Sequence, residues 1–177
     1  WSMPGEYFDE AQEILILILE KLKIGQEVEE DIKDFVTYTI NTSLGRAIIA
    51  LIYLAFRKAK INGKKGIGNE VKWDIYIRDK YNEIVERRLI EGFALFGQYM
   101  PTLYYLDREW IRTKLRDFES LKGTKVIEAL MDGYLLGNNV YDDLYELMKP
   151  YYLYYIDYSF GERHTGERLI HHISIGY

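Results

Sequence analysis

Apolar side chains recur every three or four residues along most of this chain, and this spacing restricts it to helices. The pattern is clearest between residues 29 and 60, where its apolar positions are Ile32, Phe35, Val36, Ile40, Leu44, Ala47, Ile48, Leu51, Ile52 and Ala55. A period of 3.6 residues places such side chains on one face of an α-helix. No long segment alternates with the period of two that a half-buried strand shows. Only three of the 177 residues are proline, so helices are rarely interrupted.

The same pattern along the chain predicts seven to nine helices joined by short loops. The predicted helices cover residues 6–23, 29–60 with a break near 41–43, 70–86, 87–100, 107–118, 124–136, 140–158 and 162 onward. We expect Pro101 to end the helix before it, Asp107 to cap the next one, and Pro150 to kink or restart its own helix. The first helix is apolar nearly all round in its middle, so we expect it to be buried on most sides.

These elements predict an all-α fold, an antiparallel helical stack that we interpret as a degenerate HEAT-like α-solenoid segment. No strict repeat is visible, as in an array whose period has been lost. We expect one domain over residues 1–177, made of a helical hairpin block (1–61), a basic loop (62–69) and a helical array (70–177). The chain begins with Trp1 and ends in an apolar stretch, which predicts a piece of a longer polypeptide. The alternative is an extra residue at the front and a docked helix at the end.

Composition excludes several classes of function. The 28 acidic and 23 basic side chains give a net charge of −5, which argues against a dedicated nucleic-acid binder. The chain has no cysteine, so disulfides, thiolate zinc sites and cysteine nucleophiles are excluded. No segment has the about 20 apolar residues that a membrane-spanning helix needs. We therefore expect a cytoplasmic protein that binds neither nucleic acid nor a membrane.

Two motifs have simple structural explanations. Residues 63–68 are rich in glycine and lysine but lack the preceding strand and the Lys-Ser or Lys-Thr pair of a phosphate-binding loop, which favours a basic loop between helices. Asp142 and Asp143 stand at the start of a predicted helix, where the helix dipole favours negative charge.

One further set of residues has the spacing of a metal site. His164, Glu167 and His171 fall on one helical face, and imidazole and carboxylate groups at this spacing can bind a divalent cation. Gly166 weakens that helix, so exposed polar side chains are the favoured interpretation. We expect no catalytic residue, no metal and no cofactor in this segment.

The tyrosines are the most suggestive feature of the predicted surface, since the chain has 17 of them. Tyr141, Tyr145 and Tyr152 lie off the apolar face of their helix and are expected to face solvent as partner contacts, because tyrosine is enriched at binding surfaces. Tyr104 and Tyr105, in the expected loop after Pro101, are a second candidate. The alternative is that a stack of many helices buries both faces.

Polar and small residues interrupt the apolar block near its predicted break. Ser43 and Gly45 are small enough to allow close helix approach. Asn41 and Arg46 are expected to bind neighbouring helix ends through buried hydrogen bonds, which must be fully paired. We interpret Asn41, Ser43 and Arg46 as structural rather than functional.

Five short segments occur in a characteristic order, and they are residues 40–52, 96–103, 106–110, 131–135 and 145–152. Together they resemble the C-terminal helical regions of large bacterial anti-phage proteins. These proteins are the defence-associated sirtuins and, less closely, the STAND-type NTPases of bacterial immunity. The resemblance spans about residues 30–175.

The resemblance implies a division of labour. An effector, either an NAD-hydrolysing sirtuin domain or an NTPase, would lie outside this chain. The helical region would recognise a phage structural protein and release the effector. The segment itself would be no enzyme, would also contact other parts of its parent chain, and would belong to a homo-oligomeric parent.

Three functional hypotheses follow. The leading one is a protein-binding sensor segment of an anti-phage protein. The second is a helical scaffold or oligomerisation module. The third is an enzyme that uses His164, Glu167 and His171.

Overall fold

The computed structural model describes residues 4–22, 32–64, 72–137, 139–159 and 165–176, and these form helices and no strand. The elements are η1 (Gly5–Tyr7), α1 (Phe8–Lys21), α2 (Phe35–Asn41), α3 (Ser43–Lys64), α4 (Ile75–Glu86), α5 (Ile90–Gln98), α6 (Met100–Leu106), α7 (Arg108–Phe118), η2 (Glu119–Leu121), α8 (Lys125–Gly137), α9 (Asp142–Ser159) and α10 (Thr165–Gly176). The expected all-α fold is confirmed, and the described residues contain ten α-helices against the seven to nine expected.

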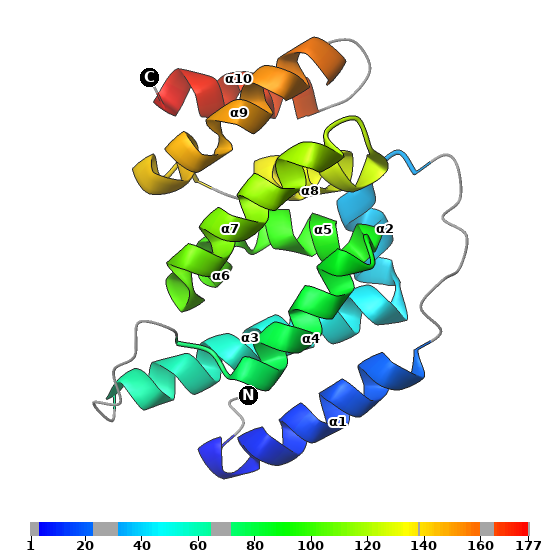
Figure 1. Cartoon of the computed structure of the whole chain (residues 1–177), viewed down its shortest axis with the longest axis vertical. Coiled ribbons are helices and arrows are strands. Elements are labelled where there is room, and N and C mark those ends of the chain that lie inside the picture. The colour runs from blue at the N-terminus through cyan, green and yellow to red at the C-terminus, as the bar shows by residue number, and fades with distance from the viewer. Residues whose placement is uncertain (1–3, 23–31, 65–71, 138, 160–164, 177) are drawn as a thin grey trace.

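Helix α5 lies at the centre, and helices from both sides of it in the sequence pack around it. Every residue of α5 from Ile90 to Gly97 is buried, and α5 contacts α2, α3 and α8. Figure 1 shows α1 at one end of the molecule and α9 with α10 at the other. In a solenoid each repeat contacts only its neighbours along the chain, whereas α2 here also contacts α8. The described residues thus form a helical stack without a visible solenoid order.

Helices α5 and α8 cross with no side chain between their backbones. These two helices pack more extensively than any other described pair. A Cβ atom at Gly97 would lie 2.0 Å from the carbonyl oxygen of Leu130, and one at Gly133 would lie 1.9 Å from that of Ala94. Real Cβ atoms do not approach other atoms so closely. The crossing therefore requires glycine at both positions.

An aromatic cluster joins α4 and α7 to α5. The centroid of the Trp110 ring lies 4.9 Å from that of Trp73 and 5.5 Å from that of Phe96. Tyr81 packs 5.9 Å from Trp110, and its buried hydroxyl donates to the Gly92 carbonyl at 3.0 Å. Each such aromatic pair contributes about 0.5–1.5 kcal/mol beyond the area it buries. The cluster fixes how α4 and α7 sit on the central helix.

The chain turns sharply between α2 and α3, at the break that the sequence predicts. The chain changes direction by 88° between α2 and α3. The Thr42 side-chain oxygen caps α3 by accepting from the Gly45 N–H at 2.9 Å, and its hydroxyl donates to the Thr39 carbonyl at 3.0 Å. In the described ranges no single helix is long and apolar enough to cross a membrane, although this bent pair reaches that length and composition together.

The polar residues at this break lie on its surface, which corrects the expectation of buried hydrogen bonds. The Asn41 amide donates to the Thr37 carbonyl at 2.9 Å, and the Arg46 Nε donates to the Ile40 carbonyl at 3.1 Å. Both side chains thus bind backbone carbonyls of α2, but both are exposed, as is Ser43. The reason is that the outer side of the bend faces water, while the inner side packs on the core.

Helix boundaries differ from the prediction at Pro101 and at the basic loop. Pro101 does not end a helix, because α5 ends at Gln98 and Pro101 lies in the first turn of α6. Proline suits a first turn because its missing N–H has no intrahelical partner there. Helix α9 continues through Pro150, so the restart does not occur, and the kink stays a prediction. Helix α3 extends to Lys64, so the first residues of the expected loop are helical.

Helix α1 lies at the edge of the stack, and the expectation that it is buried on most sides is wrong. Its buried residues are Phe8, Gln12 and Leu19, whereas Ile14 and Leu17 are exposed. The helix contacts α3 and α4, which cover one of its sides. The apolar pattern alone does not distinguish this side from the one that faces water.

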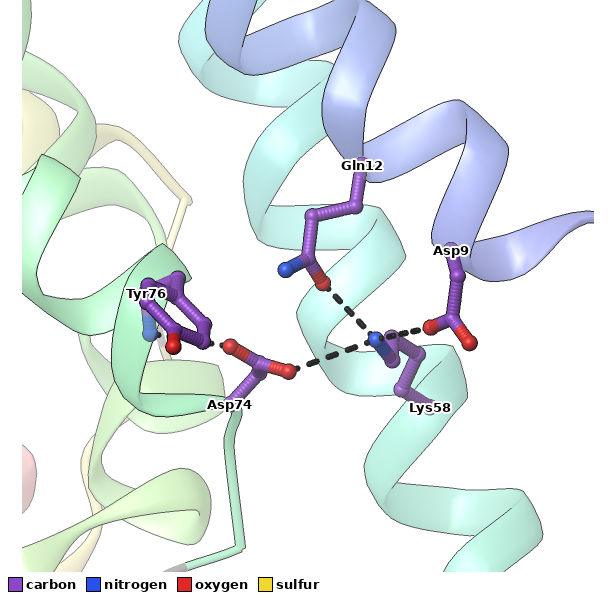
Figure 2. Close-up of polar contacts among 5 residues, drawn as sticks. All are labelled: Asp9, Gln12, Lys58, Asp74 and Tyr76. Atoms are coloured by element: carbon purple, nitrogen blue, oxygen red, sulfur yellow. Dashed lines mark hydrogen bonds and ion pairs between the residues drawn. The ribbon is translucent and has the colours of Figure 1, made fainter.

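Lys58 of α3 binds α1 and the start of α4 together, as Figure 2 shows. Its Nζ donates to Gln12 at 2.7 Å and to Asp9 at 2.9 Å, both on α1. It also donates to Oδ2 of Asp74 at 3.4 Å, and Asp74 caps α4 by accepting from the Tyr76 N–H at 2.8 Å. The Lys58 side chain is only 14% exposed, so these oxygens replace much of its hydration.

We predict that Gly97→Ala or Gly133→Ala destabilises the protein by about 3 kcal/mol or more, because the added methyl group forces α5 and α8 apart. This corresponds to a fall in melting temperature of about 10 °C. Gly63→Ala is the matched control, since Gly63 also lies in a helix but has open space around it. Thermal unfolding followed by circular dichroism measures the effect. Equal melting temperatures for Gly97→Ala and Gly63→Ala would contradict this account of the crossing.

We predict that Lys58→Met loosens α1 from the stack, because it keeps the apolar stem but removes the ammonium group shared by Gln12, Asp9 and Asp74. The loss is about 1–3 kcal/mol, as for other partly buried charged hydrogen bonds. Hydrogen exchange should accelerate in α1 more than in α5. Lys33→Met is the control, because Lys33 is exposed. Unchanged exchange in α1 would show that Lys58 does not hold this helix.

Candidate functional site

A hollow of about 480 Å³ lies between α6 and the start of α9. It is lined by Pro101, Tyr104, Tyr141, Asp142, Asp143 and Leu144. Its volume falls in the range of ligand-binding pockets, roughly 300–1,000 Å³. We treat this hollow as the candidate functional site.

The hollow is lined by residues of the short helix α6 and of the start of α9. Pro101 is the second residue of α6, and Tyr104 follows three residues later, on the same side of the helix. Asp142 and Asp143 occupy the first turn of α9, where the helix dipole stabilises their negative charge. Tyr141 stands immediately before α9, and its carbonyl accepts a hydrogen bond from the Tyr145 N–H at 2.7 Å. The lining side chains are thus carried by ordered backbone.

Tyr104 lies in the buried part of the hollow and is held by charged neighbours. Its hydroxyl donates to Asp143 Oδ2 at 3.4 Å and accepts from the Arg112 guanidinium at 3.4 Å. The Arg108 guanidinium lies 5.3 Å from the centroid of the Tyr104 ring, and Arg112 also pairs with Glu109. Because the Tyr104 side chain is only 7% exposed, its ring is a fixed part of the hollow.

The hollow combines an apolar floor with an acidic rim. Tyr104 and Leu144 are buried, whereas Tyr141 is 48% exposed and both Asp142 and Asp143 are exposed. An exposed aromatic ring beside carboxylates suits a cation that has an apolar stem. Lysine and arginine side chains have this form, because their stems pack on apolar surface while the charged end stays near water. The chemistry of the hollow therefore fits a basic side chain of a binding partner.

Two of the tyrosines that the sequence suggests for partner contact meet in this hollow, and they are Tyr104 and Tyr141. Tyr105 lies on another side of α6, where its ring packs 5.6 Å from Phe56 and Lys72 Nζ lies 3.8 Å from its centroid. Tyr104 and Tyr105 belong to helix α6 rather than to the expected loop. Adjacent residues in a helix point in different directions, which separates the two rings.

The expectation that Tyr145 and Tyr152 face solvent is wrong, because both are buried. The Tyr152 hydroxyl donates to the Tyr134 hydroxyl at 3.3 Å and lies 3.1 Å from Nδ1 of His172. The Tyr145 ring packs 5.4 Å from that of Tyr152. Helix α10, which contacts α8 and α9, covers this side of α9. Tyrosine tolerates such burial because its hydroxyl finds partners there.

The three residues considered for a metal site are only partly within the described ranges. Glu167 and His171 lie on α10 and are exposed, and His164 lies outside the described residues. Among the residues that the structure describes, no group of three or more histidine, aspartate or glutamate side chains is placed to hold a metal ion.

The sequence does not single out the other lining residues of the hollow. Pro101 and Leu144 look like ordinary helix residues, and Asp143 is explained by the helix dipole. Tyr104 and Asp143 are 39 residues apart, and a helical period carries no information over that separation. The one local signal is that an exposed tyrosine precedes two acids at the start of a helix.

No protein-family model, no curated protein and no solved structure matches this chain. The resemblance to anti-phage proteins therefore depends on the five short segments described above. Two of these segments contain Gly97 and Gly133, and the α5–α8 crossing gives both glycines a packing role. Their presence is explained by the fold and does not by itself indicate a function.

Burial of the tyrosines predicts how stability depends on alkaline pH. Burial raises the pKa of the Tyr152 phenol, and the neighbouring Tyr134 raises it further. Burial also raises the pKa of Tyr81 and of Tyr151. The folded protein thus holds these protons more tightly than the unfolded chain does. Stability is fully present below pH about 10, the ordinary pKa of tyrosine, and falls as the pH rises above it.

We predict that Tyr152→Phe reduces this alkaline loss, because one of the protons that favours folding no longer titrates. At neutral pH the variant should lose about 1 kcal/mol through its missing hydrogen bonds. Above pH about 10, its unfolding free energy should fall less steeply, by up to about 1.4 kcal/mol per pH unit. Urea unfolding at neutral and alkaline pH measures both effects. If the unfolding free energy of the variant and of the original protein falls equally steeply with pH, Tyr152 does not contribute to the alkaline loss of stability.

Proposed function

We propose that this chain is a protein-binding helical domain that serves as the sensor segment of a bacterial anti-phage defence protein. In this proposal an effector, an NAD-hydrolysing sirtuin domain or an NTPase, lies outside the chain, and the chain itself binds without catalysing a reaction. The parent protein acts in the cytoplasm, where it meets a phage structural protein. The observation that supports the binding role is the hollow beside Tyr141, and the resemblance supplies the defence context.

The partner binds by placing a lysine or arginine side chain in the hollow. Its cation lies against the exposed Tyr141 ring and near the Asp142 carboxylate, and its stem packs on the apolar floor. The buried Tyr104 is already fixed by Asp143 and Arg112, so binding orders few side chains and loses little entropy. Aromatic residues in such pockets often supply a large share of the affinity of a protein interface.

We predict that Tyr141→Ala combined with Asp142→Lys weakens capture of the phage protein at least about tenfold, because the aromatic contact is lost and the cation is repelled. Tyr105→Ala is the matched control, since it removes an exposed α6 tyrosine outside the hollow. The measurement is affinity capture by the tagged full chain from phage-infected cells, followed by identification of virion proteins and titration of the purified partner. Binding should also weaken as salt is added, because part of it is ionic.

Two outcomes would contradict the proposal. If the double variant captures the same virion protein with unchanged affinity, the hollow is not the binding site. If the unchanged chain captures no virion protein at all, the sensor function is wrong. Circular dichroism of each variant checks that the helices are intact.

A further inference from the structure

Helix α1 presents an apolar face to solvent that has no covering element among the described residues. Ile14, Leu17 and Ile18 are 52%, 53% and 42% exposed. Among the described helices, α1 is the one that exposes three large aliphatic side chains on a single face. Its opposite side is fixed against the stack by Leu19 and by the Lys58 contacts. The helix therefore cannot turn to bury this face against the described helices without losing these contacts.

Charged residues stand at both ends of the same face. Glu10, Ile14, Leu17, Ile18 and Lys21 follow one another at intervals of one, three and four residues, so they lie within about a 100° arc of the helix. Glu10 and Lys21 are exposed. The face is thus acidic at its first turn, apolar in the middle and basic at its last turn.

This arrangement is complementary to itself when a second copy lies antiparallel. A two-fold axis halfway between positions 15 and 16 places Glu10 opposite Lys21 of the second copy, and Lys21 opposite its Glu10. The same axis places Ile14 opposite Leu17, and both charged pairs lie about 8 Å along the helix from the axis. A parallel pair would instead bring like charges together at both ends. In the antiparallel pair, the positive end of each helix dipole also lies beside the negative end of the other, which is favourable.

We propose that two copies of this chain associate through an antiparallel α1–α1 contact with Glu10 paired to Lys21. The contact is isologous, so each residue of the pair occurs twice and the assembly closes as a dimer. A single short helix on each side buries less area than a stable interface of about 1,600 Å². The dimer is therefore weak, and we expect a dissociation constant of roughly 1–100 μM.

This inference is independent of the proposed function but has a consequence for it. Helices α1 and α9 lie at opposite ends of the molecule (Figure 1), so the pairing leaves the hollow at the start of α9 accessible. A dimer would then present two hollows, and a partner with repeated copies of its binding site would be held more tightly than by one.

We predict that the sign of the charges at these two positions controls dimerisation. Glu10→Lys alone, or Lys21→Glu alone, creates two like-charge contacts per dimer and should raise the dissociation constant about tenfold. The double variant Glu10→Lys with Lys21→Glu restores opposite charges and should return to within about threefold of the unchanged chain. A mixture of the two single variants should form a heterodimer in preference to either homodimer. Sedimentation equilibrium of the full chain over a range of concentrations measures these constants.

A second pair of variants tests the apolar part of the contact. Leu17→Ser should abolish the dimer, because it removes an apolar side chain at the centre of the face. Ile170→Ser on α10 should leave the dimer intact, since Ile170 is an equally exposed apolar residue on another helix. Both replace exposed side chains, so circular dichroism should show unchanged helix content.

Several results would overturn the proposal. The first is that the chain without substitutions stays monomeric up to about 1 mM. The second and third are that the single charge variants do not weaken the dimer, or that the double variant does not regain the affinity of the original chain. The fourth is that the dimer depends on Ile170 rather than on Leu17. A monomeric chain that binds a different protein through Leu17 would also overturn it, because the occupant of this face would then be that protein.

Discussion

The close approach of α5 and α8 is the constraint on which the rest of the structure depends. Gly97 and Gly133 leave no side chain between the two backbones, so carbonyl oxygens of each helix lie against Cα atoms of the other. Helices α2 and α3 then pack on α5, and α10 packs on α8. The aromatic cluster around Trp110 adds α4 and α7 to the same centre. Each layer of the stack is therefore positioned relative to this one crossing.

The candidate site is formed by the two helices that follow α5 and α8 in the chain. Helix α6 begins two residues after α5 ends, and α9 begins five residues after α8 ends. The two walls of the hollow are therefore carried by the elements that follow the two crossing helices. Tyr104 and Asp143 meet because their helices start from backbone that is already fixed. The hollow and the exposed face of α1 lie on different helices, so the two proposed contacts do not compete for the same surface.

Several expectations from the sequence survived because they depend on local chemistry. Asp107 caps α7 by accepting from the Trp110 N–H, and the polar residues near position 42 mark the bend before α3.

Other expectations were wrong where the same residue suits two different local structures. Pro101 suits both the end of one helix and the first turn of the next, and the structure uses the second. Tyr152 has an apolar ring that suits the core and a hydroxyl that suits water. Because α10 packs over this side of α9, both the ring and the hydroxyl are buried, and the hydroxyl lies beside His172.

The sequence by itself determined that this chain is helical, roughly where its helices begin and end, and which residue types were available for binding. These properties depend on a period of 3.6 residues, on caps and on composition, which act over a few residues. The tertiary structure decided which side of α1 faces water, which tyrosines are buried, and that Tyr104 and Tyr141 share one hollow. The physical reason is that burial and proximity depend on contacts between segments far apart in the chain, and in one sequence no local pattern records which segments will meet.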